Sequence, residues 1–335
     1  MINGTNIRWF FIVVSVTLGG VNRRDTFLAV LVASLWGFNF VVIDWGMGTV
    51  PPLLFAAIRF AVVAVPACLL VPRPAVPFRT VAAVGAFMSL GQFGFLYLSM
   101  HLGMPPGLAA LVLQAQAVFT IVIAAAVLRE RPSRAQVTGV ALGGAGLAVV
   151  GAGIGGEITV AALALCLLAG LSWGIGNVVS RASKAPGGLA LTVWSATVVP
   201  VPLLGLSLLI DGPAAVGQGF AHLGWHGVLS TAYTAGLCSL VGYAIFNRLL
   251  SRYPSGQVVP WVLLAPVVAM ASSWALRGEP PGPAELAGAA LLVTGVLTAQ
   301  GAIRIRGTHR SGHGEPALPG TAPGERPRAA AALMD

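Results

Sequence analysis

Ten apolar runs, separated by short polar gaps, occupy most of this chain of 335 residues. Each has roughly 17 to 25 residues, enough for an α-helix to cross a hydrocarbon layer of about 30 Å. Only 9% of the residues are charged, whereas soluble domains carry about a quarter. The sequence therefore predicts an all-α polytopic membrane protein. The ten expected transmembrane helices lie near residues 26–44, 52–71, 79–100, 105–128, 134–152, 158–180, 188–210, 225–250, 254–276 and 283–303.

Basic residues mark one side of the predicted bundle. They occupy every second loop and both ends, whereas the intervening loops hold a single basic residue, Arg277, among several acids. The positive-inside rule then places both termini in the cytoplasm. The formal net charge of +9 is explained by this topology, so it does not indicate nucleic-acid binding. The expected partners are a small-molecule metabolite and membrane lipid, with no nucleic acid, and the oligomeric state is left open.

The two ends of the chain are expected to lie outside the bundle. The apolar segment 9–20 has 12 residues, too few to span a bilayer. Residues 1–20 are therefore interpreted as a non-spanning apolar extension that could lie upstream of the working protein. After Arg306 the sequence is rich in Gly, Pro and Ala, a composition typical of disorder. Residues 307–335 are predicted to form a disordered cytoplasmic tail.

An internal repeat divides the apolar part of the chain. An offset of 149 residues aligns Glu130 with Glu279 and Gly139 with Gly288, and an offset of 137 aligns Trp36 with Trp173. These matches predict two five-helix repeats, residues 21–152 and 153–306. Because five is odd, the second repeat enters the membrane upside down. Inverted repeats are typical of secondary transporters, which bind substrate near the midplane between the halves and work by alternating access.

Each repeat carries a Trp and an Asn on one face of its first helix. Trp36 and Asn39 are spaced i, i+3, and Trp173 and Asn177 are spaced i, i+4, so each pair projects from one side. An amide in mid-membrane needs a polar partner. That partner is either a group on a neighbouring helix, in which case the Asn has a packing role between helices, or a substrate in an aqueous cavity.

Other polar residues within the predicted spans are candidates for the same cavity. Arg59 lies about 10 Å past Pro52 at 1.5 Å per residue, where a guanidinium needs an anion or backbone carbonyls. It could bind a substrate carboxylate, or be satisfied by the carbonyls of broken helices. Gln114 and Gln116 are about 200° apart on a helix, so only one is expected to face the cavity. Further candidates, for which packing is an equal alternative, are Gln92, Trp194, Ser195 and Tyr243.

Missing motifs exclude several other functions. No Walker A sequence is present, and the five His and three Cys residues show no metal-ligand spacing or nucleophile–base pattern. We therefore expect no cofactor, no metal, no catalytic residues and no enzyme activity. Acidic residues avoid the helix midpoints, which favours a facilitated carrier or exchanger over a carboxylate-based proton pump. A non-transporting membrane sensor or assembly factor remains the alternative.

Several longer stretches resemble a known family. WGFNFVVI, MPPGLAALVLQAQAVFTIVIAA, LSWGIGNVVSR and VPWVLLAPVVAMASSWAL are similar to the EamA family of the drug/metabolite transporter superfamily, over about residues 21–306. Within it, PPLLFAAIRF and VGYAIFNRLLSRYPSGQVVPWVLLAPVV resemble bacterial exporters of cysteine and O-acetylserine. The resemblance implies a ten-helix, inverted-repeat exporter in the inner (plasma) membrane, for small amino-acid-like metabolites or for drugs or other metabolites. It also implies a basic residue at position 44, where this chain has Asp44.

Overall fold

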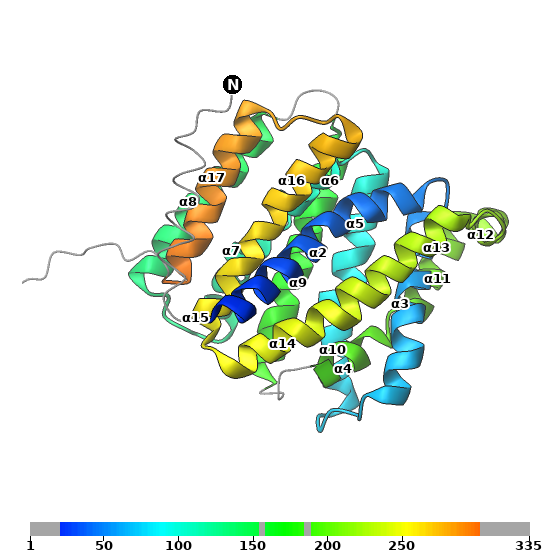
Figure 1. The fold of residues 1–335 in the computed structure, drawn as a ribbon, viewed down its shortest axis with the longest axis horizontal. Helices are drawn as coiled ribbons and strands as arrows, with labels where there is room; N and C mark the ends of the chain where they lie inside the picture. Colours follow the sequence, from blue (N-terminus) through cyan, green and yellow to red (C-terminus); the bar gives the residue numbers. More distant parts are fainter. Residues whose placement is uncertain (1–20, 154–157, 184–188, 302–335) are drawn as a thin grey trace, which may run out of the picture. The chain divides into compact units, whose positions relative to one another are not determined.

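The protein is described by a computed structural model that covers residues 21–153, 158–183 and 189–301. Helices and short turns make up these ranges, and no strand occurs within them. The expectations for residues 1–20 and 307–335 fall outside the described residues. Figure 1 shows the helices packed side by side.

The first half of the chain contains seven α-helices and one π-helix. They are α2 (Arg23–Met47), α3 (Pro52–Leu70), α4 (Phe78–Gly85), η1 (Ala86–Gly91), α5 (Gln92–His101), α6 (Pro106–Val112), α7 (Ala115–Val127) and α8 (Arg134–Gly153). The π-helix η1 joins α4 to α5, so these three segments form one continuous span, Phe78–His101.

The second half follows a similar order but is divided into more short helices. Its elements are α9 (Val160–Ala182), α10 (Leu189–Ala196), α11 (Pro200–Ile210), α12 (Gly212–Ala221), α13 (Trp225–Ala232), the π-helix η2 (Tyr233–Gly242), α14 (Tyr243–Arg252), α15 (Ser255–Val258), the 3₁₀-helix η3 (Val259–Leu263), α16 (Leu264–Arg277) and α17 (Pro283–Ala299). Like η1, η2 lies within a longer span, Trp225–Arg252.

Eight helical segments of the described chain are long and apolar enough to cross a membrane. Two others, Pro52–Val65 and Pro283–Ala299, are apolar but shorter. All ten predicted runs are helical, and the prediction of an all-helical polytopic membrane protein is confirmed. That all ten cross the bilayer stays a prediction.

The helices of the two halves begin at corresponding positions. The starts of α2 and α9 differ by 137 residues, as do those of α3 and α10. The starts of α7 and α16 differ by 149 residues, as do those of α8 and α17. Even the capping residues match, because Asn22 caps α2 and Thr159 caps α9 with side-chain oxygens that accept from backbone N–H groups. The sequence offsets therefore coincide with a repeat of helix starts.

Glycines join the fifth helix of one half to the fifth helix of the other. Helices α8 and α17 lie side by side (Figure 1). A Cβ added to Gly288 would lie 2.7 Å from the carbonyl oxygen of Gly146, and one on Gly295 would lie 2.6 Å from that of Gly139. The offset of 149 aligns Gly139 with Gly288 and Gly146 with Gly295, so the two contacts are equivalent. A two-fold relation between the halves requires this equivalence. Only glycine permits such close approach of two helix backbones.

The repeated Trp-Gly pair has a similar explanation. A Cβ on Gly37 of α2 would lie 2.7 Å from the Cβ of Val268 in α16, and one on Gly174 of α9 would lie 2.9 Å from the Cβ of Phe119 in α7. Val268 and Phe119 are themselves 149 residues apart. In each half, the glycine brings the first helix against a helix of the other half and holds the neighbouring Trp at that interface.

Candidate functional site

A cavity of about 700 Å³ lies between the two halves. Its wall is mainly apolar, with a small number of polar side chains, the composition expected of a small-molecule site. Nine of the eleven residues proposed from the sequence line it: Trp36, Asn39, Arg59, Gln92, Gln114, Gln116, Trp173, Asn177 and Tyr243. Residues far apart in the chain thus meet at one site, although no bound molecule tests the roles proposed for them.

Arg59 is a buried cation without a carboxylate partner. Its side chain is only 5% exposed, and it forms no ion pair within the described part of the chain. The guanidinium donates one hydrogen bond, from Nη1 to the Tyr97 hydroxyl at 3.3 Å, and lies 4.2 Å from the ring centroid of Phe93. Its Nε–H has no hydrogen-bond partner among the described residues. These contacts orient the cation but leave its charge uncompensated, which favours binding of an anion.

The two asparagines differ in how their amides are satisfied. Asn177 donates from Nδ2 to Gln116 Oε1 at 3.0 Å and to Thr120 Oγ1 at 3.1 Å, both on α7. It therefore links α9 to α7 as interhelical packing. Asn39 is buried, and its Oδ1 accepts no hydrogen bond from any described residue. Asn39 thus keeps a buried acceptor that a molecule in the cavity could use.

The repeat explains why Asn39 has no such partners. The offset of 137 aligns Asn177 with Phe40, and the offset of 149 aligns Gln116 and Thr120 with Ala265 and Ala269. The three polar residues of one contact are thus replaced by three apolar residues at the aligned positions of the other half. Asn39 lies one residue before the aligned position and has no counterpart of the α7 side chains.

Trp36 is held by the π-helix η2. Its indole Nε1 donates to the carbonyl oxygen of Cys238 at 3.1 Å, and its ring packs against Tyr243 and Phe246 with centroid distances of 5.1 and 5.2 Å. A π-helix leaves backbone carbonyls displaced from the α-helical pattern, and the indole satisfies one of them. Because its N–H is already used, Trp36 contributes an aromatic wall to the cavity.

The expectation that only one of Gln114 and Gln116 reaches the cavity is wrong, because both line it. The chain between α6 and α7 is not α-helical: the amide N–H of Gln114 bonds to Leu111 O and that of Gln116 to Leu113 O, both three residues back. Such 3₁₀-type turns advance about 120° per residue, so two residues no longer point in nearly opposite directions.

Trp194 and Ser195 are not brought to the cavity. Trp194 donates from its indole to the carbonyl oxygen of Val71 at 3.1 Å, and Ser195 donates to the carbonyl oxygen of Thr192 at 2.9 Å. Ser195 is nearly fully buried. Both residues pack α10 against α3 and α4, so the structure removes them from the candidate site.

Sequence reasoning missed three residues that complete the site. Phe93 and Tyr97 position Arg59, and Thr120 receives the Asn177 amide. Thr120 lies four residues after Gln116 on the same helix face, so its spacing could have revealed it. Phe93 and Tyr97 give no such signal, because their partner is on a different helix.

The cavity reaches one end of the helix bundle only. Arg181, at the end of α9, and Gln300, after α17, are exposed and line it, so it opens at the Arg181 end. A second cavity, of about 740 Å³, lies at the other end and is lined by Gly107, Met270 and Glu279 among others. A Cβ on Gly107 would lie 2.8 Å from the Met270 Cα. This tight packing of α6 on α16 separates the two cavities.

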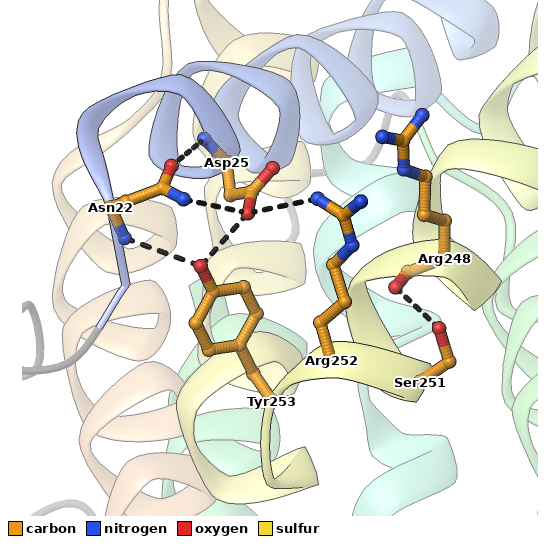
Figure 2. Close-up of polar contacts among 6 residues, drawn as sticks. All are labelled: Asn22, Asp25, Arg248, Ser251, Arg252 and Tyr253. Carbon is orange, nitrogen blue, oxygen red and sulfur yellow. Dashed lines mark hydrogen bonds and ion pairs between the residues drawn. The ribbon is translucent and has the colours of Figure 1, made fainter.

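Polar clusters fix both ends of α2. At its start, the buried carboxylate of Asp25 accepts hydrogen bonds from the Tyr253 hydroxyl at 2.8 Å and from Asn22 Nδ2 at 3.1 Å, with Arg252 Nη1 at 3.5 Å (Figure 2). At its end, Asp44 pairs with Arg277 of α16. The first helix is therefore joined to the second half at both ends.

We expect Asn177→Leu to act on stability rather than on recognition. It removes two side-chain hydrogen bonds and leaves Gln116 without its donor, so the free energy of unfolding should fall by about 1 to 2 kcal/mol. Transport per folded molecule should stay near the wild-type value. Thermal unfolding of the purified protein, together with transport normalised to folded protein, checks this, and a changed order of substrate preference would contradict it.

The fold and cavity define a class. A chain whose described residues form eight membrane-length helices, with matching halves and a cavity between them, is a multi-pass transporter of the inner membrane. The chain belongs to the EamA-like transporter family, whose model matches residues 25–152 and 160–299.

Curated relatives agree with this assignment. The chain is 41% identical to a probable amino-acid metabolite efflux pump of Salmonella typhimurium, over 87% of this chain and 99% of that protein. It is 38% identical to the probable amino-acid metabolite efflux pump of Escherichia coli, over 82% and 94%. A probable terminal-alkyne amino-acid exporter of Streptantibioticus cattleyicolor is 28% identical over 73% and 80%. A crystal structure with 21% identity and TM-score 0.56 covers 83% of this chain and 97% of its own, and shows the fold alone.

Proposed function

We propose that this protein exports small amino-acid-like metabolites, such as cysteine, O-acetylserine or related neutral amino acids, by alternating access. The observation that carries this proposal is the cavity between the halves with the uncompensated Arg59 in its wall. A guanidinium can bind a carboxylate with two parallel N–H···O bonds. The free acceptor of Asn39 would suit the ammonium group of the same substrate.

The proposed topology has ten transmembrane helices and cytoplasmic termini. The Arg181 end of the cavity then faces the cytoplasm, and the Asp44 end faces outward. The present conformation is inward-open, because the cavity reaches the exposed Arg181, whereas Ile43, the lining residue next to Asp44 in the chain, is buried. Export requires the packing of Gly107 on Met270 to open toward the outer cavity.

The test is efflux from cells with and without the protein. Cells are loaded with labelled cysteine, O-acetylserine, or a bulkier neutral amino acid, and the label that appears outside is followed over time. We expect the protein to accelerate loss of at least one small amino acid. Loss of a drug-like compound but of no amino acid would favour the alternative of a drug or other-metabolite exporter.

The non-transporting alternative makes a different prediction. A sensor or assembly factor with this cavity would bind an amino acid without moving it. Proteoliposomes that show thermal stabilisation by the amino acid, but no release of trapped label, would support that alternative and overturn the proposed export.

A further inference from the structure

Charged clusters lie at opposite ends of the bundle, at positions that the sequence repeat aligns with each other. Near the cytoplasmic end, Arg181 of α9 pairs with Glu130 at 2.9 Å. The offset of 137 aligns Arg181 with Asp44, and the offset of 149 aligns Glu130 with Glu279. The corresponding contact at the outer end therefore joins two acids, which repel each other unless a cation lies between them.

Arg277 supplies that cation. Its guanidinium pairs with Asp44, and its Nε donates to Glu279 Oε1 at 2.9 Å. The other carboxylate oxygen of Glu279 accepts a hydrogen bond from Ser273 at 2.5 Å. The positions aligned with Arg277 and Ser273 in the first half are Leu128 and Ala124. Both residues that complete the outer cluster are thus specific to the second half.

We propose that Asp44, Arg277 and Glu279 form an outer latch that holds the transporter closed to the outside, and that Arg277 compensates for the acid at position 44. The outer latch joins the last turn of α2 to the end of α16, at the closed end of the substrate cavity. Asp44 and Glu279 are less exposed there than the side chains of the pair at the cytoplasmic end, so water screens the outer contacts less.

The same geometry gives the latch its role in transport. The cluster of Asp25, Tyr253 and Arg252 holds the cytoplasmic end of α2 around the buried carboxylate of Asp25, whereas the outer latch faces the second cavity through Glu279 and Ser273. Release of Arg277 would free the outer ends of α2 and α16 while α2 stays fixed at its start. This inference rests on the proposed alternating access, but its test needs no substrate.

Cysteine accessibility tests the latch directly. Ala117 lines the inner cavity, so Ala117→Cys is made in a background with Cys68, Cys166 and Cys238 replaced by Ala. Intact cells are treated with a membrane-impermeant maleimide, which reaches this cysteine only through the outer end. We expect Arg277→Leu to increase the labelling rate about fivefold or more, as for loss of two partly exposed ion pairs.

The repeat itself supplies the rescue variant. Combining Asp44→Arg with Arg277→Leu recreates at the outer end the Arg–Glu contact and the Leu found at the cytoplasmic end. The double variant should label as slowly as the parent. The matched control is Arg181→Leu, which breaks the cytoplasmic pair and should not raise labelling from outside.

Each outcome decides the proposal. Unchanged labelling in Arg277→Leu, or labelling of the double variant as fast as that of Arg277→Leu, would overturn it. Thermal midpoints of the purified variants separate opening from unfolding: fast labelling counts as opening only where the midpoint stays near that of the parent. If no substrate is exported but labelling follows the expected pattern, the proposed function fails and the latch stands.

Discussion

Arg59→Leu is expected to reduce the apparent affinity for an exported amino acid about 100-fold while the protein still folds. The variant removes the cation that lines the middle of the cavity, and each hydrogen bond to a charged group contributes about 1.5 to 3 kcal/mol. Leu leaves no buried charge behind, so insertion and the thermal midpoint should be preserved. The measurement is the concentration dependence of efflux or of counterflow in proteoliposomes.

A second readout separates recognition from structure. The wild-type carrier should prefer an amino acid to the corresponding amine that lacks the carboxylate, and Arg59→Leu should lose this preference. Arg59→Lys keeps the charge but not the planar guanidinium, so its preference for the amino acid should lie between those of the wild type and Arg59→Leu. Tyr97→Phe is the matched control, because it removes the hydroxyl that orients Arg59 but keeps the cation. If Arg59→Leu lowers the amount of folded protein yet transports with an unchanged preference, Arg59 has a structural role.

The largest effect on stability is expected from Gly146→Leu. A Cβ at this position would lie 2.7 Å from the carbonyl oxygen of Gly288 and 2.8 Å from the amide nitrogen of Leu292. Both atoms belong to the backbone of α17, so neither can rotate away, and α8 must separate from α17. We expect a loss of about 3 kcal/mol, typical of severe overpacking, and a fall of about 5–10 °C in the thermal midpoint.

Gly144→Leu is the control on the same helix. No atom lies within 4 Å of a Cβ at Gly144, and this position is exposed. Replacing a mid-helix glycine there should leave the midpoint unchanged or raise it slightly. Size-exclusion chromatography and thermal unfolding in detergent compare the two variants. Equal midpoints for both would show that α8 and α17 do not pack as closely as described.

The sequence predicted the helices well because hydrophobic length is a local property. Every one of the ten predicted runs is helical, and the offsets of 137 and 149 residues correspond to the helix starts. Membrane-spanning length was less predictable. The helix α17 begins at Pro283 as predicted, after Gly282, whose backbone N–H donates to Glu285 Oε2 at 3.1 Å, but it ends at Ala299, before the predicted end of the apolar run. Prolines and glycines at helix ends decide how many apolar residues are helical.

The candidate site was predicted in part. Arg59 and the Trp-Asn pairs could be found because a polar group in an apolar helix needs a partner wherever it lies. Which partner it has depends on helix contacts between the halves. Asn177 meets α7 and Trp36 meets the π-helix η2, and no local pattern distinguishes them from Asn39. That Gln114 and Gln116 both reach the cavity, and that Trp194 packs instead of lining it, could not be predicted for the same reason: a 3₁₀ turn and the chain at Val71 determine these orientations.

The contact between α8 and α17 also shows where the two halves are free to specialise. Along the pseudo-two-fold axis, each glycine of one half faces a glycine of the other half. A bulkier residue in either half would therefore clash with the backbone of the other half. Away from the axis, aligned positions have different neighbours, and residues such as Asn177 and Phe40, or Arg181 and Asp44, have become different in chemistry. The contact between α8 and α17 is symmetric, whereas the aligned residues that line the cavity differ. A duplicated scaffold can therefore recognise a chiral molecule that has no symmetry of its own.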